Sequence, residues 1–161
     1  MAADYEIHIV PSVLDRLIDL EPKSSRDAAD TRADTVRALR LAVGRDLDNL
    51  LNSRNTFADL SSDFVEGRQS VLTYGLPEFT AMNLSFPVSQ QRLRQAIETT
   101  IRTFEPRMTG VVATITPPTN TDRSLRIHVD ARLLMDPSPE AIAFDIVMPI
   151  SSGKYEVKER E

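Results

Sequence analysis

The stretch IETTIRTFEPRMTGVVATIT, residues 97–116, changes its hydrophobic period halfway along, and this change decides the class of fold. Before Pro106, apolar side chains recur every three or four residues, at Ile97, Ile101 and Phe104. That spacing is typical of an amphipathic helix. Pro106 disfavours helical geometry at Glu105, so we expect the helix to end there. Beyond the proline, GVVATIT at residues 110–116 predicts a strand, so the chain passes from helix to sheet at this corner.

The segments after the corner keep a period of two. Residues 124–135 (SLRIHVDARLLM) alternate between apolar and polar side chains, and residues 141–148 (AIAFDIVM) place apolar side chains on one side. Residues 154–159 (KYEVKE) predict a short last strand whose charges suit a sheet edge. Because these strands follow one another without helices between them, they predict an antiparallel sheet.

Two long helices are expected before the sheet. Residues 34–54 (DTVRALRLAVGRDLDNLLNSR) carry one apolar stripe, and residues 89–107 carry another, with Ser89 as the predicted N-cap. Shorter helices are expected at residues 11–20 and 66–72. The fold class is therefore α+β, with two main helices packed on one face of a small antiparallel sheet formed by the C-terminal third.

Length and composition favour one globular domain. The chain has 161 residues, of which 41% are apolar and 27% charged, and both values are ordinary for a single domain. We expect one domain over residues 1–161, with residues 1–10 and 21–34 mobile. The second of these segments is polar and rich in loop formers.

Several classes of function are disfavoured by the same composition. The chain has no cysteine and two histidines, which excludes thiol chemistry and disfavours a metal site. A net charge of −5 argues against a nucleic-acid partner. No stretch approaches the roughly 18 apolar residues of a membrane span, and residues 1–10 lack the pattern of a signal peptide, so we expect none. We expect a cytoplasmic protein without a cofactor and without direct insertion into a membrane.

Catalysis by paired carboxylates is the enzymatic alternative. Glu98 and Glu105 lie seven residues apart on one predicted helix, and Glu98 falls in a four-residue series with Arg94 and Arg102 opposite the apolar stripe. Nearby arginines lower the pKa of a carboxyl group, whereas a glycosidase acid needs a raised pKa. His128 is interpreted as a solvated strand residue rather than a general base. We predict that the chain is not an enzyme.

The trio Glu105-Pro106-Arg107 has two interpretations on chemical grounds alone. The two charged residues bracket a rigid proline and could form a local ion pair that fastens the corner. They could equally offer polar contacts to another chain, since the planar guanidinium of arginine makes paired hydrogen bonds.

Four segments, taken in order, resemble the TssE family, the small baseplate subunits of type VI secretion systems, to which a baseplate wedge protein of contractile phage tails is homologous. They are PSVLDRLIDLEP, VRALRLAVGRDLDNLLNSR, SVLTYGLPEF and IETTIRTFEPRM. The resemblance covers residues 11–157. Its most specific elements are the turn Tyr74-Gly75-Leu76-Pro77 and the trio Glu105-Pro106-Arg107.

The resemblance implies a non-catalytic part of a contractile injection machine. Members of the family sit in the baseplate wedge with TssF-like and TssG-like subunits, in a baseplate docked at the inner membrane. Their fold is similar to the part of the sheath protein that exchanges strands, so they are expected to template the first sheath ring. Partner contacts are then expected at the Tyr74–Pro77 turn and the Glu105–Arg107 trio, which is implicated in binding the wedge core.

A further partner contact is expected at the last strand. Its residues Lys154, Tyr155, Glu156 and Val157 would receive a strand from a sheath subunit by backbone hydrogen bonding. Three alternatives stay open on the sequence: a baseplate protein of a phage-like or extracellular contractile particle, a cell-wall hydrolase, and a stand-alone adaptor that uses the same strand.

Overall fold

The computed structural model describes residues 13, 17, 32–57, 60–61, 63–79, 82–119, 121–135, 138–149 and 151–160. The elements in that part of the chain are α2 (Arg32–Asn52), the 3₁₀ helices η1 (Gly67–Gln69) and η2 (Val71–Thr73), α3 (Pro87–Phe104), β1 (Met108–Thr116), β2 (Ser124–Leu133), β3 (Glu140–Pro149) and β4 (Glu156–Glu159). Val13 and Leu17 are helical. The rest of the helix expected at 11–20 and the mobile segments expected at 1–10 and 21–31 lie outside the described residues.

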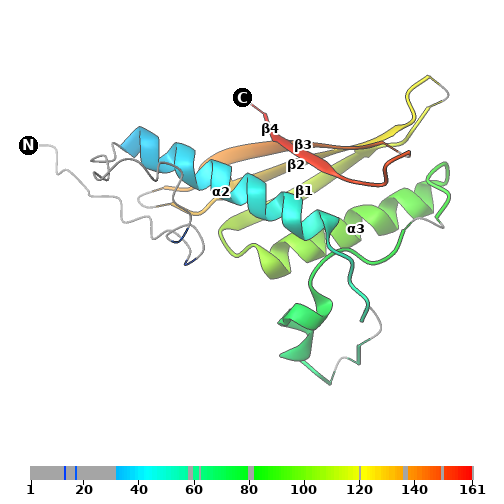
Figure 1. The fold of residues 1–161 in the computed structure, drawn as a ribbon, viewed down its shortest axis with the longest axis horizontal. Coiled ribbons are helices and arrows are strands. Elements are labelled where there is room, and N and C mark those ends of the chain that lie inside the picture. Colours follow the sequence, from blue (N-terminus) through cyan, green and yellow to red (C-terminus); the bar gives the residue numbers. More distant parts are fainter. Residues whose placement is uncertain are drawn as a thin grey trace, which may run out of the picture.

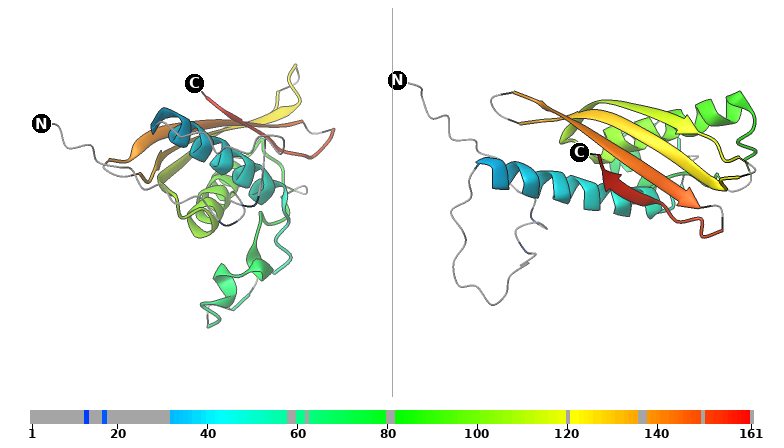
Figure 2. Two further views of the ribbon diagram at one scale, coloured as in Figure 1. Left: turned by 60° about the vertical axis from the view of Figure 1, so that its left-hand side comes forward. Right: turned by 90° about the horizontal axis from the view of Figure 1, so that it is seen from above.

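The four strands form one antiparallel sheet in the order β1-β2-β3-β4. Both long helices lie on one face of this sheet, and the other face is uncovered in the described structure (Figure 1, Figure 2). The predicted α+β class, with two helices on one face of a C-terminal sheet, is confirmed.

The core lies between the helices and the inner face of the sheet. The stripes predicted on both helices are buried except at Val36 and Phe104, which are partly exposed. Every second residue of β2 is buried, as its alternation predicted. The largest fully buried side chains are Val43, Leu47, Leu50, Leu51, Leu93, Ile97, Ile101, Leu125, Ile127, Leu133, Phe144 and Ile146. Gly44 brings α2 close to the sheet, because a Cβ atom there would lie 3.4 Å from the Phe144 ring.

Three helix boundaries differ from the sequence prediction. α3 begins at Pro87 with Phe86 as N-cap, so Ser89 is not the cap. A proline suits the first helical position because that position needs no N–H donor. α2 begins at Arg32, which places the end of the segment expected to be mobile inside a helix. The helix expected at residues 66–72 is two 3₁₀ turns, separated by the extended backbone of Ser70.

No helix in the described part of the chain is both long enough and apolar enough to span a membrane.

Candidate functional site

The Glu105-Pro106-Arg107 corner is held by an internal ion pair. α3 ends at Phe104, and the Glu105 N–H donates to the Ile101 carbonyl (2.8 Å). The Glu105 side chain then turns inward and is only 4% exposed. Its two carboxylate oxygens accept from Arg107 Nε (2.6 Å) and Nη2 (2.5 Å). The paired, charge-assisted geometry makes this a strong contact.

Asp46 of α2 joins the same pair from a distant part of the chain. Its Oδ2 accepts from Arg107 Nη2 (2.6 Å), and its Oδ1 accepts from Arg45 (2.9 Å). The two carboxylates raise the pKa of Arg107 above its ordinary value, and the hydrogen bond that Arg107 donates to Glu105 is the largest cause. Arg107 therefore stays charged and ties the end of α3 to the middle of α2.

The predicted Tyr74–Pro77 turn packs between the ends of the two long helices. The Tyr74 ring meets Phe104 of α3 edge to face, with ring centroids 5.3 Å apart. Leu76 is buried, and its N–H donates to the Ser53 carbonyl (3.0 Å) just after α2. Burial raises the pKa of the Tyr74 hydroxyl, and the carboxylates of Asp46 and Glu105 raise it further. The structure thus brings the turn and the corner together.

Gly75 permits this close packing. Its φ is +106°, a conformation that other residues rarely adopt. A Cβ atom at this position would lie 2.4 Å from the Ser53 carbonyl oxygen. The turn therefore requires glycine both for its backbone conformation and for the space beside α2.

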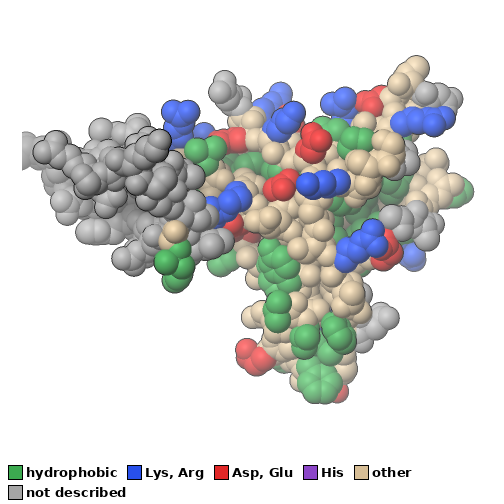
Figure 3. All heavy atoms as spheres, in the orientation of Figure 1, with side chains coloured by type: hydrophobic (Ala, Val, Ile, Leu, Met, Phe, Trp, Pro, Cys, Tyr) green, Lys and Arg blue, Asp and Glu red, His purple; other side chains and the backbone are tan. Residues whose placement is uncertain are grey.

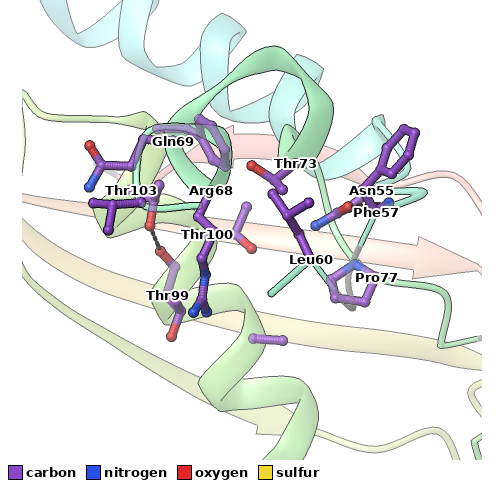
Figure 4. Close-up of a pocket in the computed structure, with 13 residues that line it drawn as sticks. Asn55, Phe57, Leu60, Arg68, Gln69, Thr73, Pro77, Thr99, Thr100 and Thr103 are labelled. Carbon is purple, nitrogen blue, oxygen red and sulfur yellow. Dashed lines mark hydrogen bonds between the residues drawn. The ribbon is translucent and has the colours of Figure 1, made fainter. Parts of the chain in front are cut away.

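A groove of about 400 Å³ opens between this turn and α3 (Figure 4). Thr99, Thr100 and Thr103 line one side of it from α3, while the other side includes Phe57 and Pro77. A smaller hollow of about 90 Å³ lies on the other side of the turn and includes Pro77 and Tyr155 in its lining. Pro77 lines both hollows, so the turn separates them.

Beside the groove, the chain carries an exposed apolar lobe, which we define as residues 57, 60–61 and 63–73. It projects away from the sheet and the helices (Figure 1), and apolar side chains gather at its tip (Figure 3). The large exposed apolar residues in it are Phe57, Phe64, Val65, Val71 and Leu72. A cluster of this kind on a small protein is a candidate interaction surface.

The residues expected to accept a partner strand lie partly outside β4. Lys154 and Tyr155 precede the strand, whereas Glu156 and Val157 begin it. Asn52, the last residue of α2, already binds the Tyr155 backbone: its Nδ2 donates to the Tyr155 carbonyl and its Oδ1 accepts the Tyr155 N–H, both at 2.9 Å. Contact between residues 154–157 and a partner stays a prediction.

The carboxylates considered for catalysis are both engaged in internal hydrogen bonds. Glu98 accepts the Ala113 N–H (3.0 Å), and Glu105 is bound by Arg107. Glu98 was expected on the exposed side of its helix, but its side chain is only 13% exposed because it reaches β1. His128 lies on the open face of the sheet, where it bonds Asp145 (2.7 Å) and Asp130 (3.1 Å). Among the described residues no His, Asp and Glu side chains cluster closely enough to hold a metal ion.

Sequence reasoning missed two features of this region. The lobe has apolar residues but no helical or strand period, so its only sequence signal is the presence of several large apolar residues between turn formers. The contact between Asp46 and Arg107 joins residues 61 positions apart, and no spacing rule connects them. Whether the corner and the turn bind a partner is not decided by their internal contacts, and that assignment stays a prediction.

The part of the chain that contains the helices, the corner and the first two strands matches a known family. Residues 37–138, well over half of the chain, match the family described as baseplate wedge protein gp25. The protein belongs to this family, which includes TssE, and the resemblance drawn from the sequence is confirmed. No curated protein matches the chain. The family supports a structural role in the baseplate of a contractile tail, in contact with other baseplate proteins.

Proposed function

We propose that this protein is the TssE-like baseplate subunit of a type VI secretion system, where it joins the baseplate wedge and templates the first sheath ring. Its wedge partners would be TssF-like and TssG-like subunits. Membership in the baseplate wedge family carries the proposal. The protein would act in the cytoplasm, in a baseplate docked at the inner membrane, and would have no catalytic activity.

The apolar lobe supports a wedge contact beside the corner and the turn. Val71 is 86% exposed and Phe64 is 61% exposed, and burying such side chains against a partner is favourable by about 25 cal/mol per Å². The lobe and the threonine-lined groove lie together, so one partner segment could cover both. Pro106 is exposed at the corner and is a further candidate for the wedge contact.

The β4 edge supports the contact with sheath strands. Arg160 donates its N–H to the Ala143 carbonyl of β3 (2.9 Å). Because backbone groups alternate in direction along a strand, Val157 and Glu159 direct theirs away from β3. We therefore place the added strand at Val157–Glu159, since Asn52 occupies the Tyr155 backbone.

The experiment that tests the wedge contact uses a matched pair of substitutions. Val65 in the lobe and Val88 in the first turn of α3 are 63% and 64% exposed, so each can receive an aspartate without disturbing the core. We would purify three tagged proteins from the native cells, each with the proteins bound to it: wild type, Val65→Asp and Val88→Asp. We expect large baseplate subunits with wild type and Val88→Asp, and their loss with Val65→Asp.

The identity of the recovered chains separates the alternatives. Recovery of TssF-like and TssG-like subunits supports the secretion-system role, whereas recovery of phage tail proteins assigns the chain to a phage-like particle. If no baseplate subunit accompanies the wild type, the proposal fails. If the three proteins recover baseplate subunits equally, the wedge contact does not involve the lobe.

A further inference from the structure

The outer side of β1 is bound by two side chains of α3. Glu98 Oε1 accepts the Ala113 N–H (3.0 Å), and Arg102 Nη2 donates to the Val111 carbonyl (2.7 Å). The two side chains also pair with each other, with 3.3 Å between Arg102 Nη2 and Glu98 Oε2. One donor and one acceptor of the β1 backbone are therefore occupied on the side away from β2.

These two contacts reproduce the bonds of a neighbouring strand. In a parallel ladder a single residue donates to one carbonyl and accepts from the N–H two positions further on. Arg102 and Glu98 supply that donor and that acceptor. The Ala113 N–H has one hydrogen, so a new strand has to displace a carboxylate whose charge strengthens the bond.

The β1 edge is also bent at the same place. The pairing with β2 shifts between Thr109 and Val112, where Gly110 adopts a φ of +63°. A bulge of this kind twists an edge strand away from flat pairing, and edge strands protected in this way resist the addition of another strand.

The opposite edge lacks an equivalent pair of charged side chains on the backbone of Val157 and Glu159 among the described contacts. Asn52 of α2 reaches the backbone at Tyr155, just before β4 begins. As far as the described residues show, the sheet is thus closed at the middle of β1 and open along β4.

We propose that Glu98 and Arg102 close the β1 edge, so that the sheet accepts a strand at β4 only. The identity of the strand added at β4 rests on the proposed function. The closure of the β1 edge does not, because it is a property of the free chain. A subunit with two open edges could add strands on both sides or join another copy of itself. A subunit with one open edge can start a ring in one direction.

The test compares two double variants of the free protein. Glu98→Ala with Arg102→Ala removes both side-chain contacts with the β1 backbone. Glu98→Gln with Arg102→Lys keeps an acceptor and a donor at the same positions. We expect the alanine pair to associate with itself at concentrations where wild type and the conservative pair sediment as monomers. We also expect amide exchange at Ala113 to become about tenfold faster in the alanine pair, since one charged hydrogen bond is lost.

Monomeric behaviour of the alanine pair with unchanged exchange at Ala113 overturns the proposal. If the alanine pair does not fold, the proposal is tested by comparing the amide exchange rates of Ala113 and Val157 in the wild type. Ala113 and Val157 both lie at sheet edges, and we expect Ala113 to exchange at least about tenfold more slowly because its N–H is bound. The backbone N–H of Lys158 points toward β3 on the same short strand. Its exchange rate is therefore used to correct the rate at Val157 for fraying of β4. Equal corrected rates overturn the proposal. Neither measurement involves baseplate partners. Failure of this proposal can therefore be distinguished from failure of the proposed wedge function.

Discussion

At the scale of single residues, Arg107 connects three separated parts of the chain. Its side chain binds Glu105 after α3 and Asp46 in α2, while its carbonyl accepts the Leu134 N–H just after β2 (2.7 Å). Two carboxylates without this guanidinium would be left close together, with the Glu105 side chain in the protein interior. The internal contacts therefore predict a structural role for Arg107 in the free protein, whatever it contributes to a partner.

We predict that Arg107→Ala lowers the free energy of unfolding by about 3 kcal/mol, since removal of one partner leaves a buried carboxylate without its counter-charge. Arg126 offers a control, because it pairs with Asp122 (3.0 Å) on the surface. Arg126→Ala should lower the free energy of unfolding by less than about 1 kcal/mol. Urea denaturation of both variants measures the difference. Similar small losses in both would show that the corner is not stabilised by its ion pair.

His128 is a second residue whose surroundings predict a measurable effect. The hydrogen bond to Asp145 is the largest cause that raises the pKa of His128 above its ordinary 6.5, and Asp130 adds to it. The folded protein therefore favours the charged imidazole. The resulting stability is fully present below pH 6.5 and is lost as the pH rises through the folded-state pKa.

We therefore expect the free energy of unfolding of wild type to fall as the pH rises from 6.5 through the folded-state pKa of His128. Asp145→Asn should flatten this fall because it removes the main partner of the imidazolium. Thermal unfolding across a pH series measures the slope, and His128→Gln serves as the non-titrating control. An identical slope in all three proteins would contradict the prediction.

At the scale of elements, the Tyr74–Pro77 turn fixes how the lobe leaves the helices. We predict that Gly75→Ala destabilises the protein by more than about 2 kcal/mol, because the strain of a positive φ adds to a steric clash with Ser53. Gly153→Ala is the control, since Gly153 also has a positive φ but no atom lies within 4 Å of its added Cβ. Chemical denaturation of both variants separates strain from the clash. Equal losses would mean that the turn can move away from α2.

The elements were predictable where local periodicity decides them. In β2 the pleat sends alternate side chains to opposite sides, so the sequence of residues 124–133 was enough to assign its buried face. The end of α3 followed from Pro106, because that proline restricts the residue before it. A glycine inside a helix does not by itself reveal its neighbour, so the packing of Gly44 against Phe144 could not be read from the sequence.

The remaining features depend on contacts between distant segments. Glu98 was assigned to the exposed side of its helix, because spacing alone cannot reveal that the edge of β1 lies beside it. The use of Asn52 to bind Tyr155 was equally hidden, since an asparagine at the end of a helix usually serves as a local cap. The corner itself was recognised, but its third member, Asp46, was not.

At the scale of the whole molecule, the described surface divides into regions of different character. The open face of the sheet is polar and carries His128, Asp130 and Asp145, whereas the lobe exposes large apolar side chains and contains only Thr73 as a buried residue. A segment with so few buried side chains opens locally at low free energy. The lobe should therefore be the part of the protein whose behaviour changes most on assembly.

We predict that, in the free protein, amides of the lobe exchange with solvent at least about a hundredfold faster than those of β2, because the lobe opens without global unfolding. In the complex purified with its baseplate partners, burial of the apolar side chains should slow exchange in the lobe, while the open face of the sheet should not change. Hydrogen exchange followed by mass spectrometry measures both states, with free Val65→Asp as a control for direct effects on the lobe. Protection spread over the open face, with none in the lobe, would place the wedge contact on the sheet and contradict the docking surface proposed for this subunit.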